Sequence, residues 1–239
     1  MQTKDIEYRD GALTLRGLLA FDEANAGKRP GILVVHEAWG LGEHAMERAK
    51  MLAREGYVAL AADMYGDRRL ASDLPQAMEL IGELRTDPAK LRQRALSALA
   101  ALKAQPNVDG TKLAAIGFCF GGTTVLELAR GGAEVKGVVS FHGGLQTMAP
   151  AEPGAVTPKV LVCTGADDPM IPPAQVTDFE EEMRRAGADW QVIVYGRTVH
   201  SFTNPDAGKT VKLDGVAYNA QTDKRSWAAM RVFFAEIFA

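Results

Sequence analysis

The sequence alternates between short apolar runs and longer segments with helical periodicity. The apolar runs are continuous in valine, isoleucine, leucine and alanine, which predicts strands that are covered on both faces of a sheet. They occupy residues 31–36, 57–63, 112–118, 137–143, 159–165 and 190–195. Strands of this kind, separated by helices, indicate a mainly parallel sheet.

Amphipathic patterns fill the intervals between the apolar runs. They predict helices over about 43–55, 74–104 with a break near Asp87-Pro88, 123–130, 173–186 and 222–238. The first 22 residues instead alternate as a hairpin, with Asp10-Gly11 as its turn. We therefore expect an α/β fold with a doubly wound sheet and helices on both faces. No linker or repeat interrupts the pattern, so residues 1–239 are predicted to form one domain.

Composition and charge exclude several classes of protein. Of the 239 residues, 47% are hydrophobic and 24% are charged, as in ordinary globular chains. The formal net charge of −3 gives no basic surface for nucleic acid or for an anionic membrane. No apolar run reaches the roughly 20 residues that span a bilayer, and no apolar h-region follows the polar first residues, so no secretory leader is expected. We expect a cytoplasmic protein without nucleic-acid or membrane partners, either a monomer or a weak dimer.

The chain has two cysteines, and their surroundings differ. No CxxC pair occurs, so a redox or zinc-ribbon function has no support. Cys163 lies within the apolar run VLVCTG and is predicted to be an inert filler of the core. Cys119 lies in IGFCFGG, between a predicted strand and a predicted helix. It is either a buried cysteine beside packing glycines or a nucleophile.

The segment around Cys119 has the form of a nucleophile elbow, G-x-S-x-G, with cysteine in the serine position. On such a sharp turn the side chain projects beyond the sheet, and Gly117 and Gly121 remove side chains that would collide there. The N-terminus of the following helix favours a thiolate over a thiol. The pattern therefore favours the nucleophile.

An elbow nucleophile requires an acid and then a histidine later in the chain. The segment GADDPMIP follows a predicted strand and offers Asp167 and Asp168, of which Asp168 is preferred; either one could instead cap a helix. The segment TVHSF follows the last strand and offers His200. Carboxyl ends of parallel strands share one edge of the sheet, so these groups can meet.

Two of the other three histidines are alternatives to His200. His36 and His142 end predicted strands and compete with it, whereas His44 is expected to be solvated on a helix face. The segment HEAWG also suggests the zinc motif H-E-x-x-H, but Gly40 stands where the second histidine would be. No metal and no cofactor are predicted.

The segments GFCFGG, GADDPMIP and VHSF, with HEAWGL upstream, together resemble the dienelactone hydrolase family of the α/β-hydrolase superfamily. The resemblance implies the α/β-hydrolase fold and a catalytic triad of Cys119, Asp168 and His200. It further implies that Glu37 contacts the resting thiol and modulates its ionisation. The backbone N–H groups of Ala38 and Phe120 would form the oxyanion hole.

One position departs from the family pattern. Family members carry an arginine two residues after the phenylalanine of H-S-F, and Asn204 stands there in this chain. The identity of the substrate is therefore left undetermined. Arg68, Arg69 and Arg197 are candidate replacements for the lost arginine. The substrate pocket is expected to be lined by five residues: His36, Trp39, His142, Phe202 and Asn204.

These observations predict a cofactor-free cysteine hydrolase that acts on a small ester or lactone through an acyl-enzyme. Two alternatives remain. One is a general carboxylesterase or thioesterase that uses the same triad, and the other is a non-catalytic binding module with an α/β-hydrolase-like fold.

Overall fold

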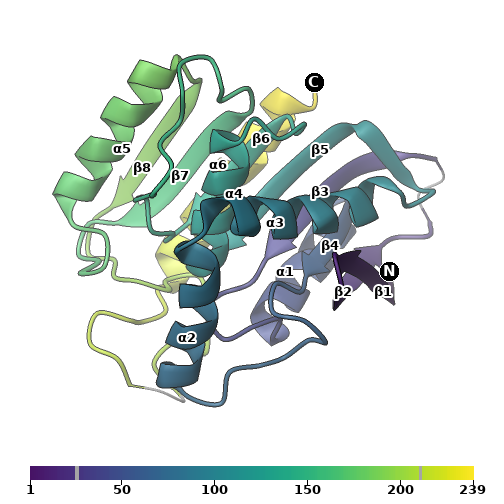
Figure 1. The fold of residues 1–239 in the computed structure, drawn as a ribbon, viewed down its shortest axis with the longest axis horizontal. Helices are drawn as coiled ribbons and strands as arrows, with labels where there is room; N and C mark the ends of the chain where they lie inside the picture. The colour runs from purple at the N-terminus through teal and green to yellow at the C-terminus, as the bar shows by residue number, and fades with distance from the viewer. Residues whose placement is uncertain (25–26, 210–211) are drawn as a thin grey trace.

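An eight-stranded sheet runs through the molecule with helices packed on both of its faces (Figure 1). This computed structural model describes residues 1–24, 27–209 and 212–239. The strand order is β1-β2-β4-β3-β5-β6-β7-β8, and the strands from β3 to β8 pair in parallel. The strands are β1 Gln2–Asp10, β2 Leu13–Phe21, β3 Arg29–Val35, β4 Val58–Ala62, β5 Val108–Phe118, β6 Gly137–Phe141, β7 Lys159–Gly165 and β8 Trp190–Tyr195. The predicted fold class is confirmed.

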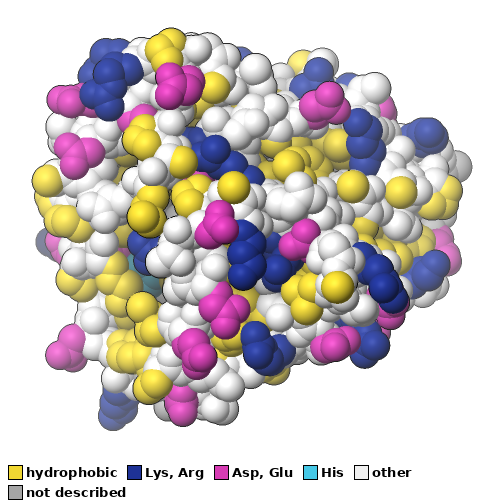
Figure 2. Space-filling model, in the orientation of Figure 1, with side chains coloured by type: hydrophobic (Ala, Val, Ile, Leu, Met, Phe, Trp, Pro, Cys, Tyr) yellow, Lys and Arg dark blue, Asp and Glu magenta, His cyan; other side chains and the backbone are white. Residues whose placement is uncertain are grey.

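The sheet divides the core into two apolar layers. The helices are α1 Glu43–Arg54, α2 Leu74–Arg85, α3 Pro88–Lys103, α4 Phe120–Arg130, α5 Pro173–Ala186 and α6 Ala220–Ile237. Side chains of α1 and α6 fill the layer on one face, and those of α2 to α5 fill the other. None of these helices, within the described ranges, is long and apolar enough to cross a membrane. Basic and acidic side chains are interspersed on the face shown in Figure 2.

Several element boundaries differ from the predictions by one to four residues. The turn of the antiparallel hairpin lies at Gly11-Ala12 rather than at Asp10-Gly11, because Asp10 still pairs with Leu13. Strand β5 begins four residues earlier than predicted, at Val108. Helix α4 begins at Phe120 rather than at residue 123, because its first turn contains Gly121 and Gly122, and glycine weakens a helical pattern. The predicted break between α2 and α3 is confirmed.

The turn from β5 into α4 leaves no room for side chains at its glycines. A β-carbon on Gly117 would overlap the backbone carbonyl of Gly121, and one on Gly121 would overlap the carbonyl of Val35 in β3. The first turn of α4 therefore packs directly on the ends of β3 and β5. Cys119 stands between these two glycines, so its backbone position is set by this close approach.

Replacing Gly121 with alanine is expected to lower the free energy of unfolding by about 2 kcal/mol or more, because the added methyl group would force α4 away from β3. Gly82, in the middle of α2, provides the matched control, since a β-carbon there would meet nothing within 4 Å. Gly82→Ala is expected to stabilise the protein by up to about 1 kcal/mol through helix propensity. Urea unfolding followed by circular dichroism measures both. Equal midpoints for the two variants would show that the elbow has room for a side chain.

Candidate functional site

Cys119 lies at the junction of β5 and α4 in a backbone conformation that side chains rarely adopt. Its φ is 53° and its ψ is −113°. The Cys119 N–H donates both to the Phe141 carbonyl at 3.0 Å and to Nδ1 of His142 at 3.1 Å. Its side chain is half-buried, whereas Cys163 is fully buried and has its pKa raised to about 12 by that burial. Of the two cysteines, Cys119 is the one that is accessible.

His200 and Asp168 meet beyond the ends of β8 and β7. Nδ1 of His200 lies 2.8 Å from Oδ2 of Asp168, and both side chains are buried. The other carboxylate oxygen of Asp168 accepts the Met170 N–H at 2.9 Å, which fixes the carboxylate. Asp167 is exposed and its N–H bonds the Thr198 carbonyl, so it does not orient His200. The acid next to the histidine is Asp168.

The charge state of His200 depends on Cys119. Burial alone would lower the pKa of His200, but the negative charge of the Cys119 sulfur and the hydrogen bond to Asp168 outweigh burial and raise it to about 10. Nε2 of His200 is buried without a hydrogen-bond partner among the described residues. Its interaction with the sulfur in this conformation is therefore electrostatic rather than a formed hydrogen bond.

Two backbone N–H groups next to the elbow are available to a ligand. Neither the Ala38 nor the Phe120 N–H donates a hydrogen bond to another described residue. The hydroxyl of Tyr65 donates to the Ala38 carbonyl at 2.9 Å and so fixes this loop. Phe120 is the first residue of α4, where the N–H groups of a helix are normally unpaired.

His36 lies behind that loop and not in a pocket wall. Its Nε2 accepts the Met64 N–H at 3.2 Å, so Nδ1 carries the proton and donates to the Glu37 carbonyl at 2.6 Å. The side chain is 1% exposed, and burial lowers its pKa. That His36 lines the substrate pocket stays a prediction; in this structure the histidine supports the loop that carries Glu37.

Glu37 is held by Asn204 and His44. Nδ2 of Asn204 donates to Oε2 of Glu37 at 2.5 Å, and Nδ1 of His44 lies 3.4 Å from the same oxygen. Burial would raise the pKa of Glu37, but its interactions with these two residues and with His142 lower it to about 2. Within the described residues no hydrogen bond joins Glu37 to Cys119, so the contact that the family resemblance implies is not made in this conformation.

His142 and Phe202 also lie behind the site. Since Nδ1 of His142 accepts the Cys119 N–H, Nε2 carries the proton and donates to the Thr203 hydroxyl at 2.8 Å. Burial and the charge of His200 keep the pKa of His142 well below its usual value. Phe202 is fully buried, with its ring 5.0 Å from that of His142. That His142 and Phe202 line the substrate pocket stays a prediction, and in this structure both side chains are buried.

Sequence reasoning did not identify the support that α1 gives to the loop after β8. His44 was expected to be solvated, but its ring packs 4.7 Å from that of Phe118 and Nε2 lies 3.2 Å from the Thr203 carbonyl. One turn later, the buried Arg48 donates to the same carbonyl at 2.5 Å and to Asp223 at 2.8 Å. The sequence offered one signal for this support: Arg48 lies directly before Ala49 in the apolar stripe of α1.

A cavity of about 290 Å³ borders Glu37 and the residue after His200. Trp39, Ser201 and Asn204 are among the residues that line it. None of the three candidate arginines, Arg68, Arg69 and Arg197, lines this cavity. Arg68 is held by Asp5 and by the backbone carbonyls of Arg16 and Gly17. Among the described residues, no group of three histidine, cysteine or acidic side chains is placed to hold a metal ion.

NMR titration of the four histidine rings tests this electrostatic arrangement. His200 is expected to remain protonated through neutral pH and to titrate near pH 10, while His36 and His142 remain neutral into the acid range. In Asp168→Asn the neutral amide no longer stabilises the imidazolium, so the pKa of His200 is expected to fall. A His200 ring that titrates at its ordinary value in both proteins would contradict the arrangement.

The chain was compared with known proteins. The sequence model of the dienelactone hydrolase family matches residues 15–238. An uncharacterized protein of Caenorhabditis elegans is 39% identical over 155 residues, which cover 63% of this chain and 96% of that protein. A Yersinia pestis protein, named provisionally as a carboxymethylenebutenolidase, is 28% identical over 231 residues, or 93% and 84% of the two chains.

Solved structures show the same relationship. A dienelactone hydrolase-like promiscuous phosphotriesterase from metagenomic libraries is 45% identical, with a TM-score of 0.92 and coverage of 99% of this chain and 98% of that one. A protein titled m3DLH is 46% identical, with a TM-score of 0.95 and coverage of 100% and 99%. The chain therefore belongs to the dienelactone hydrolase family and is a carboxylic ester hydrolase.

Proposed function

We propose that the protein hydrolyses a small ester or lactone by nucleophilic catalysis, with a triad of Cys119, His200 and Asp168. The observation that carries the proposal is the pairing of a strained, half-buried cysteine with a histidine whose Nδ1 is fixed by Asp168. The pKa of that histidine is raised to about 10 by the charge of the cysteine sulfur. A thiolate next to an imidazolium is the reactive form of such a pair.

The reaction begins when the Cys119 thiolate attacks the ester carbonyl carbon. The resulting oxyanion accepts hydrogen bonds from the N–H groups of Ala38 and Phe120. When the intermediate collapses, the C–O bond breaks and His200 donates its proton to the leaving oxygen, which leaves a thioester on Cys119. His200, now neutral, removes a proton from water, and the hydroxide releases the acid and restores the thiolate.

The binding-module alternative predicts a different reactivity for Cys119. A thiolate held by His200 alkylates rapidly near neutral pH, whereas a thiol without an activating partner alkylates slowly. The discriminating measurement is the rate of labelling by iodoacetamide, compared with that of a free cysteine in the same buffer. Labelling no faster than free cysteine would favour a binding module over an enzyme.

A second candidate activity is the hydrolysis of aryl phosphotriesters. The similarity to the promiscuous phosphotriesterase supports it, because that protein is 45% identical over nearly the whole of both chains. The thiolate would attack phosphorus and expel the aryl oxide, which gives a phosphorylated cysteine that water then hydrolyses. The two N–H groups would bind the phosphoryl oxygen in place of a carbonyl oxygen.

Cys119→Ala is expected to reduce hydrolysis of p-nitrophenyl acetate and of an aryl dialkyl phosphate by about 1,000-fold or more, since neither can proceed without the nucleophile. Release of p-nitrophenol measures both. Cys163→Ala is the matched control: it removes a buried sulfur from the core and is expected to affect stability rather than rate. Activity of Cys119→Ala within about tenfold of the native protein would show that the elbow is structural.

The loss of the family arginine predicts weak selection for anionic substrates. An arginine–carboxylate pair contributes on the order of 2 kcal/mol, and about 1.4 kcal/mol corresponds to tenfold in kcat/KM. We expect the native protein to prefer an anionic lactone over a neutral ester of equal size by less than about tenfold. Asn204→Arg is expected to raise that preference, and kcat/KM for both substrates measures it. A native preference of about a hundredfold would mean that another cation, with Arg69 and Arg197 the first to replace, binds the carboxylate.

A further inference from the structure

Three residues with left-handed backbone conformations meet around the elbow. Besides Cys119, His142 directly after β6 has a φ of 41°, and Ser201 directly after His200 has a φ of 55°. His142 contacts both other segments, because its ring accepts the Cys119 N–H and packs 5.2 Å from the ring of His200. Backbone strain of this kind gathers at functional sites, so the relative placement of these three residues is expected to matter for the reaction.

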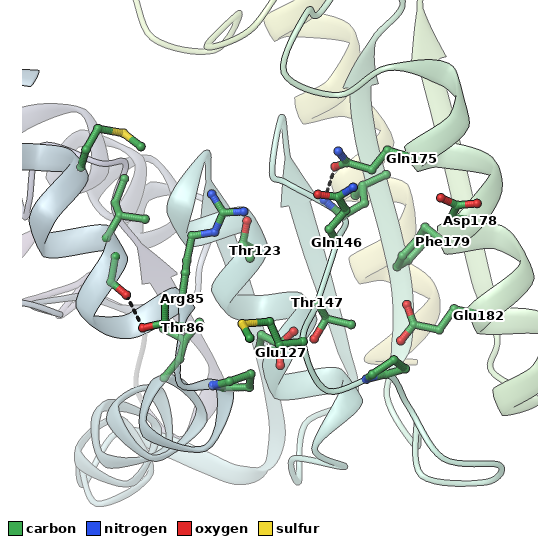
Figure 3. Close-up of a pocket in the computed structure, with 18 of the residues that line it drawn as sticks. Arg85, Thr86, Thr123, Glu127, Gln146, Thr147, Gln175, Asp178, Phe179 and Glu182 are labelled. Carbon is green, nitrogen blue, oxygen red and sulfur yellow. Dashed lines mark hydrogen bonds between the residues drawn. The ribbon is translucent and has the colours of Figure 1, made fainter.

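The segment that begins at His142 is fixed against α4. A β-carbon on Gly143 would lie 2.6 Å from the backbone carbonyl carbon of Gly122, in the first turn of that helix. Thr123, which lines a larger cavity of about 620 Å³ between α2, α4 and α5 (Figure 3), donates its hydroxyl hydrogen to the Gly144 carbonyl at 3.0 Å. None of the triad residues lines this larger cavity. The backbone after β6 therefore cannot shift relative to the elbow without displacing α4.

The His142 ring joins this fixed segment to the loop after β8. Its Nδ1 accepts the Cys119 N–H at 3.1 Å, and its Nε2 donates to the Thr203 hydroxyl at 2.8 Å. A backbone N–H can only donate, so the ring must be neutral with its proton on Nε2, and the Thr203 oxygen must accept. The ring also lies 6.2 Å from that of Phe118 and 5.0 Å from that of Phe202. One ring therefore sets the spacing between the elbow and this loop.

The Thr203 hydroxyl determines which nitrogen of His142 carries the proton. His142 is fully buried and Thr203 is 1% exposed, so a lost hydrogen bond between them leaves the Nε2–H group unpaired, which is costly. The ring responds either by rotating or by moving its proton to Nδ1, where it opposes the Cys119 N–H. Both responses break the bond to that N–H and leave it only the Phe141 carbonyl as an acceptor.

We propose that His142 and Thr203 are positioning residues, and that the bridge they form holds the Cys119 sulfur at the distance from Nε2 of His200 that the reaction requires. His142 acts through the backbone of Cys119, and Thr203 acts through His142. A misplacement of about 1 Å between reacting groups can reduce a rate about 100-fold. The inference rests on the proposed esterase function, because it assigns a part in that reaction to two residues outside the triad.

Thr203→Val tests the bridge, because valine keeps the shape of the side chain and lacks the hydroxyl. The Thr203 carbonyl is held separately by Arg48, so the loop keeps its attachment to α1. We expect kcat/KM for p-nitrophenyl acetate to fall about tenfold or more. Thr203→Ser restores the hydroxyl and is expected to keep kcat/KM within about threefold of the native value.

Thr198→Val is the matched control. Thr198 lies in the same loop, is likewise 1% exposed, and shares a hydrogen bond of 2.8 Å with the hydroxyl of Thr222 in α6. Its removal is expected to lower stability and to change kcat/KM less than about twofold. An equal loss of kcat/KM in the two valine variants would show that any buried hydroxyl of this loop affects the rate, and would overturn the proposal.

His142→Asn tests the bridge from the other side and decides the proposal if Thr203→Val does not fold. Asparagine tolerates a left-handed conformation, and its amide can accept the Cys119 N–H, but it is too short to reach Thr203. We expect a loss of about tenfold or more in kcat/KM, and no further loss when Thr203→Val is added. Losses that multiply in the double variant would show that the two residues act separately, and would overturn the proposal.

The pKa of His200 reports its approach to Cys119 without a substrate. Burial lowers this pKa, but the charge of the Cys119 sulfur and the bond to Asp168 raise it to about 10. NMR titration is expected to give a lower pKa of His200 in Thr203→Val and the native value in Thr198→Val.

The outcomes separate the positioning role from the proposed function. If Thr203→Val and His142→Asn both keep kcat/KM within about twofold of native, the positioning role fails and the esterase function stands. If the native protein hydrolyses no ester, the proposed function fails, and the NMR comparison decides the inference alone. A pKa of His200 that is unchanged in Thr203→Val would then refute it, and a lowered one would support it.

Discussion

The left-handed backbone conformation at Cys119 is the constraint on which the site depends. A φ of 53° in a residue with a β-carbon costs on the order of 1–3 kcal/mol, and it persists only where the surroundings determine it. Here the direct contact of Gly121 with β3 and the two acceptors of the Cys119 N–H leave no alternative path from β5 into α4. The strain places the sulfur beyond the sheet and next to the first N–H groups of α4.

The same support also positions the histidine. His142 accepts the Cys119 N–H on one side of its ring and donates to Thr203 on the other, three residues after His200. The Thr203 carbonyl in turn accepts from Arg48, which is paired with Asp223 of α6. Cys119 and the loop that carries His200 are therefore attached to one buried network that joins α1 and α6. A change in that network would move Cys119 and His200 relative to each other.

The sequence predicted the features that depend on local pattern and on the order of residues along the chain. Strand runs and the spacing of glycines around Cys119 indicated the elbow, and the order cysteine, acid, histidine identified Asp168 and His200 as candidates. It did not predict the partners of His44 or Arg48, because these side chains meet Thr203 across 159 and 155 residues of chain. The larger cavity was also unpredictable, since its walls come from separate helices whose apolar residues resemble ordinary core positions.

The histidines show why residue type alone does not assign a role. Burial lowers the pKa of His36 and His142, and their partners are backbone groups and a hydroxyl, which do not compensate an imidazolium. His200 is also buried, yet a carboxylate at Nδ1 and the cysteine sulfur together outweigh the same desolvation. A carboxylate and a sulfur on the two sides of the ring thus raise the pKa of His200 despite its burial. The pKa of each histidine thus depends on the charged groups next to its ring and on its burial, and not on residue type alone.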